Sequence, residues 1–274
     1  MDNKEFNYEE PVEIAEGIFW VGYADRYAGF HCNPYLIVDS DEAVLIDSGS
    51  RNDFSTVMLK IMRAGVNPKN ITRLIYQHYD PDLCGNIPHM EAMIDNNDLQ
   101  IISQRENNIF IKYYSVKSPL LCIEEIGSVY KFKSGRRLEF IHTPYSHAPG
   151  SFMTYDTKTK VLFSSDIFGA YDSNWTFYAQ ISDSCLECDS SDGCKTTGSD
   201  KCQLEGMVNF HKCIMPSEKA LKYAINIIEK LDISLIAPQH GSIFKTRESQ
   251  KAAIKRLNML EKVGFDCFIE GKTV

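Results

Sequence analysis

Three features are missing from this sequence, and each absence excludes a class of protein. No apolar run approaches the roughly 20 residues that a membrane-spanning helix needs. Basic residues are not in excess: 29 Lys and Arg stand against 37 Asp and Glu, for a formal net charge of −8, which argues against nucleic acid as the main partner. The N-terminal Met-Asp-Asn-Lys-Glu-Phe has no basic region followed by an apolar one, as a signal peptide would. We therefore expect a cytoplasmic protein without a membrane segment.

A regular cysteine framework is also missing. The nine cysteines are an odd number, which argues against a secreted disulfide scaffold in a cytoplasmic protein. Five of them fall in a polar stretch at about residues 182–213, which we expect to be a mobile or peripheral insertion: Cys185, Cys188, Cys194, Cys202 and Cys213. Cys185 and Cys188 form a CxxC pair, but no second CxxC completes a zinc ribbon. Zinc binding, redox chemistry and free thiols stay open for this segment.

The composition indicates a globular protein with one sizeable core. Of the 274 residues, 43% are hydrophobic and 24% are charged. Strands are expected at Tyr35–Asp39 and Ala43–Ile46, because both stretches are rich in β-branched and aliphatic residues. The next apolar residues, from Phe54 to Met62, fall on one face of a helix that Gly65 ends. A further strand leads into His78, so we expect a β-α-β unit with a parallel strand pair.

The most informative stretch runs from Ile75 to Gly85. An apolar strand ends there in one imidazole and two carboxylates at alternate positions: His78, Asp80 and Asp82. Pro81 and Gly85 prevent a long helix, so the stretch is predicted to be a strand that enters a turn. Oxygen donors beside a nitrogen donor suit iron or manganese better than zinc. A polar surface loop is the alternative that these residues alone leave open.

Three later stretches share this arrangement. His147, Asp166 and His240 each follow an apolar strand. Functional side chains commonly lie on loops at the rim of a rigid sheet, so we expect the four stretches to converge. His142 is expected to be a structural histidine.

The order and local sequence of these stretches resemble the metallo-β-lactamase fold, and more closely the diiron domain of flavodiiron proteins. The resemblance covers nearly the whole chain, and it implies one four-layer αββα sandwich over residues 1–274. Its motifs are Asn33-Pro-Tyr-Leu-Ile-Val-Asp-Ser, Val44-Leu-Ile-Asp-Ser, Thr143-Pro-Tyr-Ser-His-Ala-Pro-Gly-Ser-Phe, Phe163-Ser-Ser-Asp-Ile-Phe-Gly and Ile236-Ala-Pro-Gln-His-Gly.

Two positions depart from the family patterns. Hydrolases of this fold usually carry His-x-His-x-Asp-His, whereas this chain has Asp80 at the second His position and Leu83 at the last. Flavodiiron proteins have an acidic residue, usually Glu, at the position of Asp80, and many have His at the position of Leu83. The departures count against a dinuclear hydrolase, which we keep as an alternative. We expect Leu83 to leave an open coordination position and to line a dry pocket.

The resemblance implies two non-haem iron ions, with Asp166 bridging them. The first ion would take His78, Asp80 and His147, and the second would take Asp82 and His240. We also expect three neighbours to support or line the site: Asp47, Tyr79 and Cys84.

Flavodiiron proteins carry a flavodoxin-like domain after this one, but the present sequence ends at Val274 without a phosphate-cradling loop, so no flavin is expected on this chain. The sequence instead resembles flavin-free oxygen-binding diiron proteins. That resemblance implies a dioxygen-binding sensor of oxygen or iron, with a signalling partner in bacterial chemotaxis. The alternative is a reductase of dioxygen, peroxide or nitric oxide that takes electrons from a separate donor protein. A homodimer is expected from the family alone.

Overall fold

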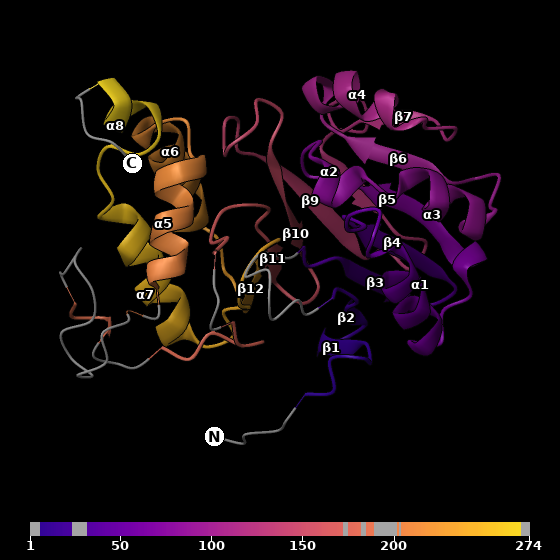
Figure 1. The fold of residues 1–274 in the computed structure, drawn as a ribbon. Helices are drawn as coiled ribbons and strands as arrows, with labels where there is room; N and C mark the ends of the chain where they lie inside the picture. The colour runs from indigo at the N-terminus through magenta and orange to yellow at the C-terminus, as the bar shows by residue number, and fades with distance from the viewer. Residues whose placement is uncertain are drawn as a thin grey trace.

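The computed structural model describes residues 6–23, 32–171, 175–181, 185–188, 202 and 204–269. Two β-sheets lie face to face, and helices cover the outer face of each, which confirms the predicted four-layer αββα sandwich (Figure 1). None of the described helices is both long enough and apolar enough to cross a membrane.

The first sheet contains the first seven strands in chain order. Strands β4 and β5 are parallel and flank helix α1, as the β-α-β pattern predicts. Helices α1, α3 and α4 lie on the outer side of this sheet (Figure 1). The strands are β1 (Val12–Ala15), β2 (Ile18–Trp20), β3 (Tyr35–Asp39), β4 (Glu42–Ile46), β5 (Ile71–Ile75), β6 (Gln100–Ser103) and β7 (Leu120–Cys122). The helices are α1 (Phe54–Arg63), α2 (Pro81–Cys84), α3 (Ile87–Ile94) and α4 (Arg105–Ile111), with short 3₁₀ helices at Pro68–Asn70 and Lys112–Tyr114.

The second sheet has the strand order β12-β11-β10-β9-β8. Its strands are β8 (Val129–Lys131), β9 (Arg137–His142), β10 (Phe152–Asp156), β11 (Val161–Phe163) and β12 (Leu235–Ala237). Strands β11 and β12 are parallel, so their carboxyl ends meet at the same edge. The helices on this side are α5 (Glu205–Ile214), α6 (Glu218–Ile228), α7 (Arg247–Asn258) and α8 (Phe265–Ile269).

Three apolar layers hold the sandwich together. The layer between the sheets contains Trp20, Ile75 and Phe163, and the two outer layers pack helices onto each sheet. Strand β4 is buried along its whole length, because its side chains alternate between the inner and an outer layer. For this reason the strands appear in the sequence as continuous apolar runs that end abruptly at polar residues.

The segment at about 182–213 was expected to be a mobile or peripheral insertion, but its C-terminal end is a packed helix. Residues from Glu205 to Ile214 form helix α5, and Met207, Val208 and Phe210 are buried against the second sheet. These apolar residues recur at helical spacing, a signal that the polar composition of the preceding stretch obscured. Cys194 and most residues around it lie outside the described part of the chain.

Candidate metal centre

The residues expected to bind metal come from the segments after four strands and from the start of one short helix. His147 lies between β9 and β10. His78 follows β5, Asp166 follows β11 and His240 follows β12. The turn predicted after His78 contains helix α2, in which Asp80 is the N-cap residue and Pro81 the first helical residue. Proline is favoured at that position because its fixed φ suits a helix and no amide hydrogen is needed there. Asp82 lies in the first turn of this helix.

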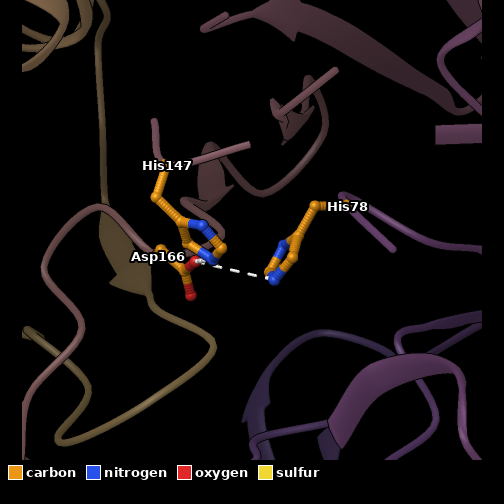
Figure 2. Close-up of side chains that lie close together, drawn as sticks. All are labelled: His78, His147 and Asp166. Carbon is orange, nitrogen blue, oxygen red and sulfur yellow. Dashed lines mark ion pairs between the residues drawn. The ribbon is translucent and has the colours of Figure 1, made fainter. Parts of the chain in front are cut away.

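One half of the candidate site is formed by two histidines and two aspartates. The Nε2 atom of His147 lies 2.7 Å from Oδ2 of Asp166 and 3.3 Å from Oδ2 of Asp80. The Nε2 atom of His78 lies 3.6 Å from the same Asp166 oxygen and 3.8 Å from the same Asp80 oxygen. His78, His147 and Asp166 can offer ligand atoms that all lie within 4.8 Å of one another (Figure 2).

The other half is formed around the second oxygen of Asp166. The Nε2 atom of His240 lies 3.4 Å from Oδ1 of Asp166 and 3.2 Å from Oδ2 of Asp82. Asp166 therefore presents Oδ2 to one group of side chains and Oδ1 to the other. This is the arrangement that a carboxylate bridging two metal ions requires. The structure thus brings together all six residues that the sequence singles out as metal ligands.

The burial of Asp166 supports a cation in this position. The side chain is 1% exposed, and within the described part of the chain neither carboxylate oxygen has a hydrogen-bond partner of acceptable geometry. Buried carboxylate oxygens are normally hydrogen-bonded, and leaving them unpaired is costly. A pair of cations would satisfy both oxygens, so the donor set of three carboxylates and three imidazoles fits two iron ions.

The side chains of the site shift one another's pKa values. Burial acts to lower the pKa of His147, but the nearby carboxylates of Asp166 and Asp80 outweigh burial and raise that pKa to about 10. Burial acts to raise the pKa of Asp166, but His78, His147 and His240 together hold it well below its usual range. Burial lowers the pKa of His78. A metal ion must therefore displace a proton from His147, because only the unprotonated nitrogen can bind a metal.

Polar contacts behind the ligands fix their orientation. The Nδ1 atom of His78 lies 3.2 Å from Oγ of Ser165, the residue before Asp166. The buried Asp47 accepts a hydrogen bond from the amide of Gln77 at 3.2 Å, so it supports the backbone just before His78. The Cys84 thiol lies 3.7 Å from the His78 carbonyl oxygen. Asp47 and Cys84 thus contact the backbone that carries His78.

The loop that carries His240 is held by residues that sequence reasoning did not single out. The side-chain amide of Asn33 donates to the carbonyl oxygens of Pro238 at 3.1 Å and Gly241 at 2.9 Å. The indole of Trp175 donates to the same Gly241 oxygen at 3.0 Å. Gln239 donates to Oδ2 of Asp82 at 3.3 Å. The position of Gln239 directly before His240 was the only sequence signal for its role.

Strained backbone surrounds Asp166. Ser165 has φ 55° and Phe168 has φ 70°, although neither is glycine. A non-glycine residue in this region costs about 1–3 kcal/mol, and such residues cluster at functional sites. Asp47 and Tyr145, which lie in two other loops of the site, also have positive φ values, 53° and 62°. The surrounding contacts must therefore hold these turns in place.

Two of the expected pocket residues, Leu83 and Tyr79, pack against other side chains. Leu83 is fully buried in the apolar layer between the first sheet and its helices, with Val57, Met58 and Ile87 in the same layer. Leu83 and Asp82 are adjacent in helix α2, so their side chains lie on different faces of it. The expected role of Leu83 beside the metal pocket stays a prediction. The Tyr79 ring packs against Phe110 of α4, with ring centroids 4.5 Å apart. Tyr79 therefore links the site to α4.

Two curated relatives match most of this chain. "Uncharacterized protein MJ0732" of Methanocaldococcus jannaschii is 28% identical over 85% of the chain and 57% of that protein. A nitric oxide reductase of Moorella thermoacetica is 25% identical over 86% of the chain and 58% of that protein. The chain thus spans less than two thirds of the length of these curated relatives.

Solved structures with the same fold include one of nearly equal length. A structure described as a peroxy diiron species of the chemotaxis sensor ODP superposes with a TM-score of 0.74, at 24% identity over 95% of this chain and 98% of that one. The flavodiiron protein from Giardia intestinalis gives a TM-score of 0.72, at 22% identity over 93% of this chain and 60% of that one.

A family model supplies the family assignment. The model described as "ODP family beta lactamase" matches residues 30–241, a range that contains all six clustered His and Asp residues. The matched range ends at the residue after His240, so it covers both halves of the site. The chain therefore belongs to the ODP family of β-lactamase-like proteins.

Proposed function

We propose that this chain binds two iron ions and acts as a dioxygen-binding sensor. The observation that carries the proposal is the position of the buried Asp166, whose two oxygens face the two halves of one site. The structural likeness to a chemotaxis sensor of nearly equal length supports the sensory role. The partner expected from that likeness is a signalling protein of chemotaxis.

Two groups of residues would bind the two ions. His78, Asp80 and His147 would hold the first ion, while Asp82 and His240 would hold the second, with Asp166 between them. The second half offers fewer side-chain donors, so it is the half with room for an external ligand. Two reduced iron ions would supply the electrons that make dioxygen binding possible.

A reductase that takes electrons from a separate protein is the second candidate function. The similarity to a nitric oxide reductase over 86% of the chain favours it. A hydrolase is less well supported, because Asp80 replaces the histidine that hydrolases of this fold usually have.

The proposal is tested with iron-loaded protein under anaerobic conditions. We expect two iron ions per chain, and we expect one stoichiometric, lasting change in the optical spectrum when air is admitted to the reduced protein. Asp166→Asn provides a matched control of nearly equal volume, and it should bind at most one ion tightly. Sustained consumption of oxygen or nitric oxide with a simple electron donor would contradict the sensor proposal and support the reductase proposal. Two tightly bound zinc ions in protein from iron-replete cells, without an oxygen-dependent spectrum, would contradict both.

A further inference from the structure

Helix α5 places a further buried histidine against the turn that carries Asp166. His211 is 0% exposed. Its Nδ1 atom lies 2.8 Å from the carbonyl oxygen of Met207, and its Nε2 atom accepts a hydrogen bond from the amide of Phe168 at 3.2 Å. Because a carbonyl oxygen can only accept, Nδ1 must carry the proton and Nε2 the lone pair. The two contacts therefore select one neutral form of His211.

The bond from Phe168 is made at the most strained point of the Asp166 turn. Phe168 is a bulky residue at φ 70°, and Ser165 on the other side of Asp166 has φ 55°. The turn is closed by short-range bonds, from the Ile167 amide to the Ser164 carbonyl at 3.2 Å and from the Gly169 amide to the Asp166 carbonyl at 2.8 Å. Residues in this conformation persist only where surrounding structure holds them. His211 supplies a long-range contact of that kind.

Other residues of α5 contact both sides of the site. The Phe210 ring lies 5.8 Å from the His240 ring, measured between centroids. A Cβ atom at Gly169 would lie 2.8 Å from Cε1 of Phe210, so only glycine allows this close approach. The amide of Tyr171 donates to the Gly206 carbonyl at 3.3 Å. Helix α5 thus packs on the segment after Asp166 and on His240.

We propose that His211 is a positioning residue that keeps Asp166 between the two halves of the metal site. The inference rests on the proposed dinuclear site. It extends that site to α5, whose histidine accepts a hydrogen bond from the backbone of Phe168, two residues after Asp166.

Loss of the His211 contact should affect the two halves unequally. If the turn relaxes, Asp166 can no longer present an oxygen to each half. The first half keeps three other side chains, His78, Asp80 and His147. The second half keeps only Asp82 and His240. Binding of the second metal ion should therefore weaken more than binding of the first.

The test is a calorimetric titration with Co²⁺ alone, without oxygen, on the full chain and three variants. His211→Phe keeps an aromatic ring but removes the acceptor, whereas His211→Gln can still accept from Phe168 and donate to Met207. His89→Phe is the matched control, because His89 is on α3 and packs against Phe54. We expect His211→Phe to raise the second dissociation constant roughly 10- to 100-fold, the usual cost of removing a residue that orients a ligand. The first constant should change little, and His211→Gln should restore most of the loss.

Several outcomes decide the matter. Equal weakening of both constants in His211→Phe, or no weakening of either, overturns the positioning role while leaving the dinuclear site intact. A wild-type protein that binds fewer than two Co²⁺ ions overturns the proposed function and the inference together. If His211→Phe does not fold, the wild type still decides by ¹⁵N NMR with Zn²⁺. The Nε2 resonance of His211 should be that of an unprotonated nitrogen and should shift when the second equivalent is added, and a resonance that does not move overturns the inference.

Discussion

Acid should destabilise the metal-free protein through His211, and the His211→Gln variant isolates that contribution. Burial lowers the pKa of His211 from 6.5 to about 4, although the hydrogen bond to Met207 and the charge of Asp166 act in the opposite direction. Between these two values the unfolded chain binds a proton at this histidine and the folded chain does not. Stability therefore rises with pH over this window and is lost as the pH falls from 6.5 towards 4.

The size of the effect follows from the two pKa values. One pKa unit corresponds to about 1.4 kcal/mol, so a pKa lowered from 6.5 to about 4 implies a loss of about 3 kcal/mol between pH 7 and pH 4. Glutamine does not titrate, so His211→Gln lacks this loss while other groups contribute equally to both proteins. Relative to the variant, the wild type should become less stable by this amount on acidification.

The assay is urea unfolding of both proteins at several pH values, with a chelator present so that metal binding does not contribute. The quantity to plot is the free energy of unfolding of the wild type minus that of His211→Gln. A difference that stays constant from pH 7 to pH 4 would refute a buried neutral His211. A difference that grows in favour of the wild type at acid pH would show instead that the histidine is charged in the folded state.

Three further predictions concern the core, the ion pair and the cysteines. Leu83→Ala should lower the free energy of unfolding, measured in urea, by about 2–5 kcal/mol while two metal ions still bind, because Leu83 packs in the core. A change in the affinity for the second metal ion without loss of stability would show instead that Leu83 acts mainly at the metal site. Arg136→Met should cost about 3–5 kcal/mol, because it leaves the buried Asp156 carboxylate without the guanidinium 2.7 Å away. Adding Asp156→Asn should recover part of that loss, and no recovery would mean that packing dominates. Replacing Cys185 and Cys188 with Ser should leave metal stoichiometry unchanged by elemental analysis, and lost metal would assign these cysteines to the main site.

The sequence predicted the fold and the convergence of the site because both depend on local patterns. Each apolar strand ends at a polar residue, and parallel pairing brings those ends to one edge. His78, Asp166 and His240 are such residues. The β-α-β unit around α1 followed from the helical spacing of its apolar residues.

What the sequence did not predict depends on long-range packing. Nothing local distinguishes Asn33 as a donor to two carbonyl oxygens more than 200 residues away in the chain. The location of Leu83 depends on whether Pro81 begins a helix or a turn, and both are compatible with proline. Helix α5 was not predicted, because its apolar residues follow a long polar stretch that dominates the composition of this segment. His211 could be assigned only once Phe168 was seen to donate to it.

The distance between two bound iron ions tests the central claim most directly. X-ray absorption spectroscopy on reduced, iron-loaded protein measures that distance through iron–iron scattering. Bridging by Asp166 predicts a separation of about 3.5–4 Å, the usual value for dinuclear sites, and predicts its loss in Asp166→Asn. Two tightly bound iron ions without an iron–iron contribution at this distance, or the same contribution in Asp166→Asn, would contradict the bridged site.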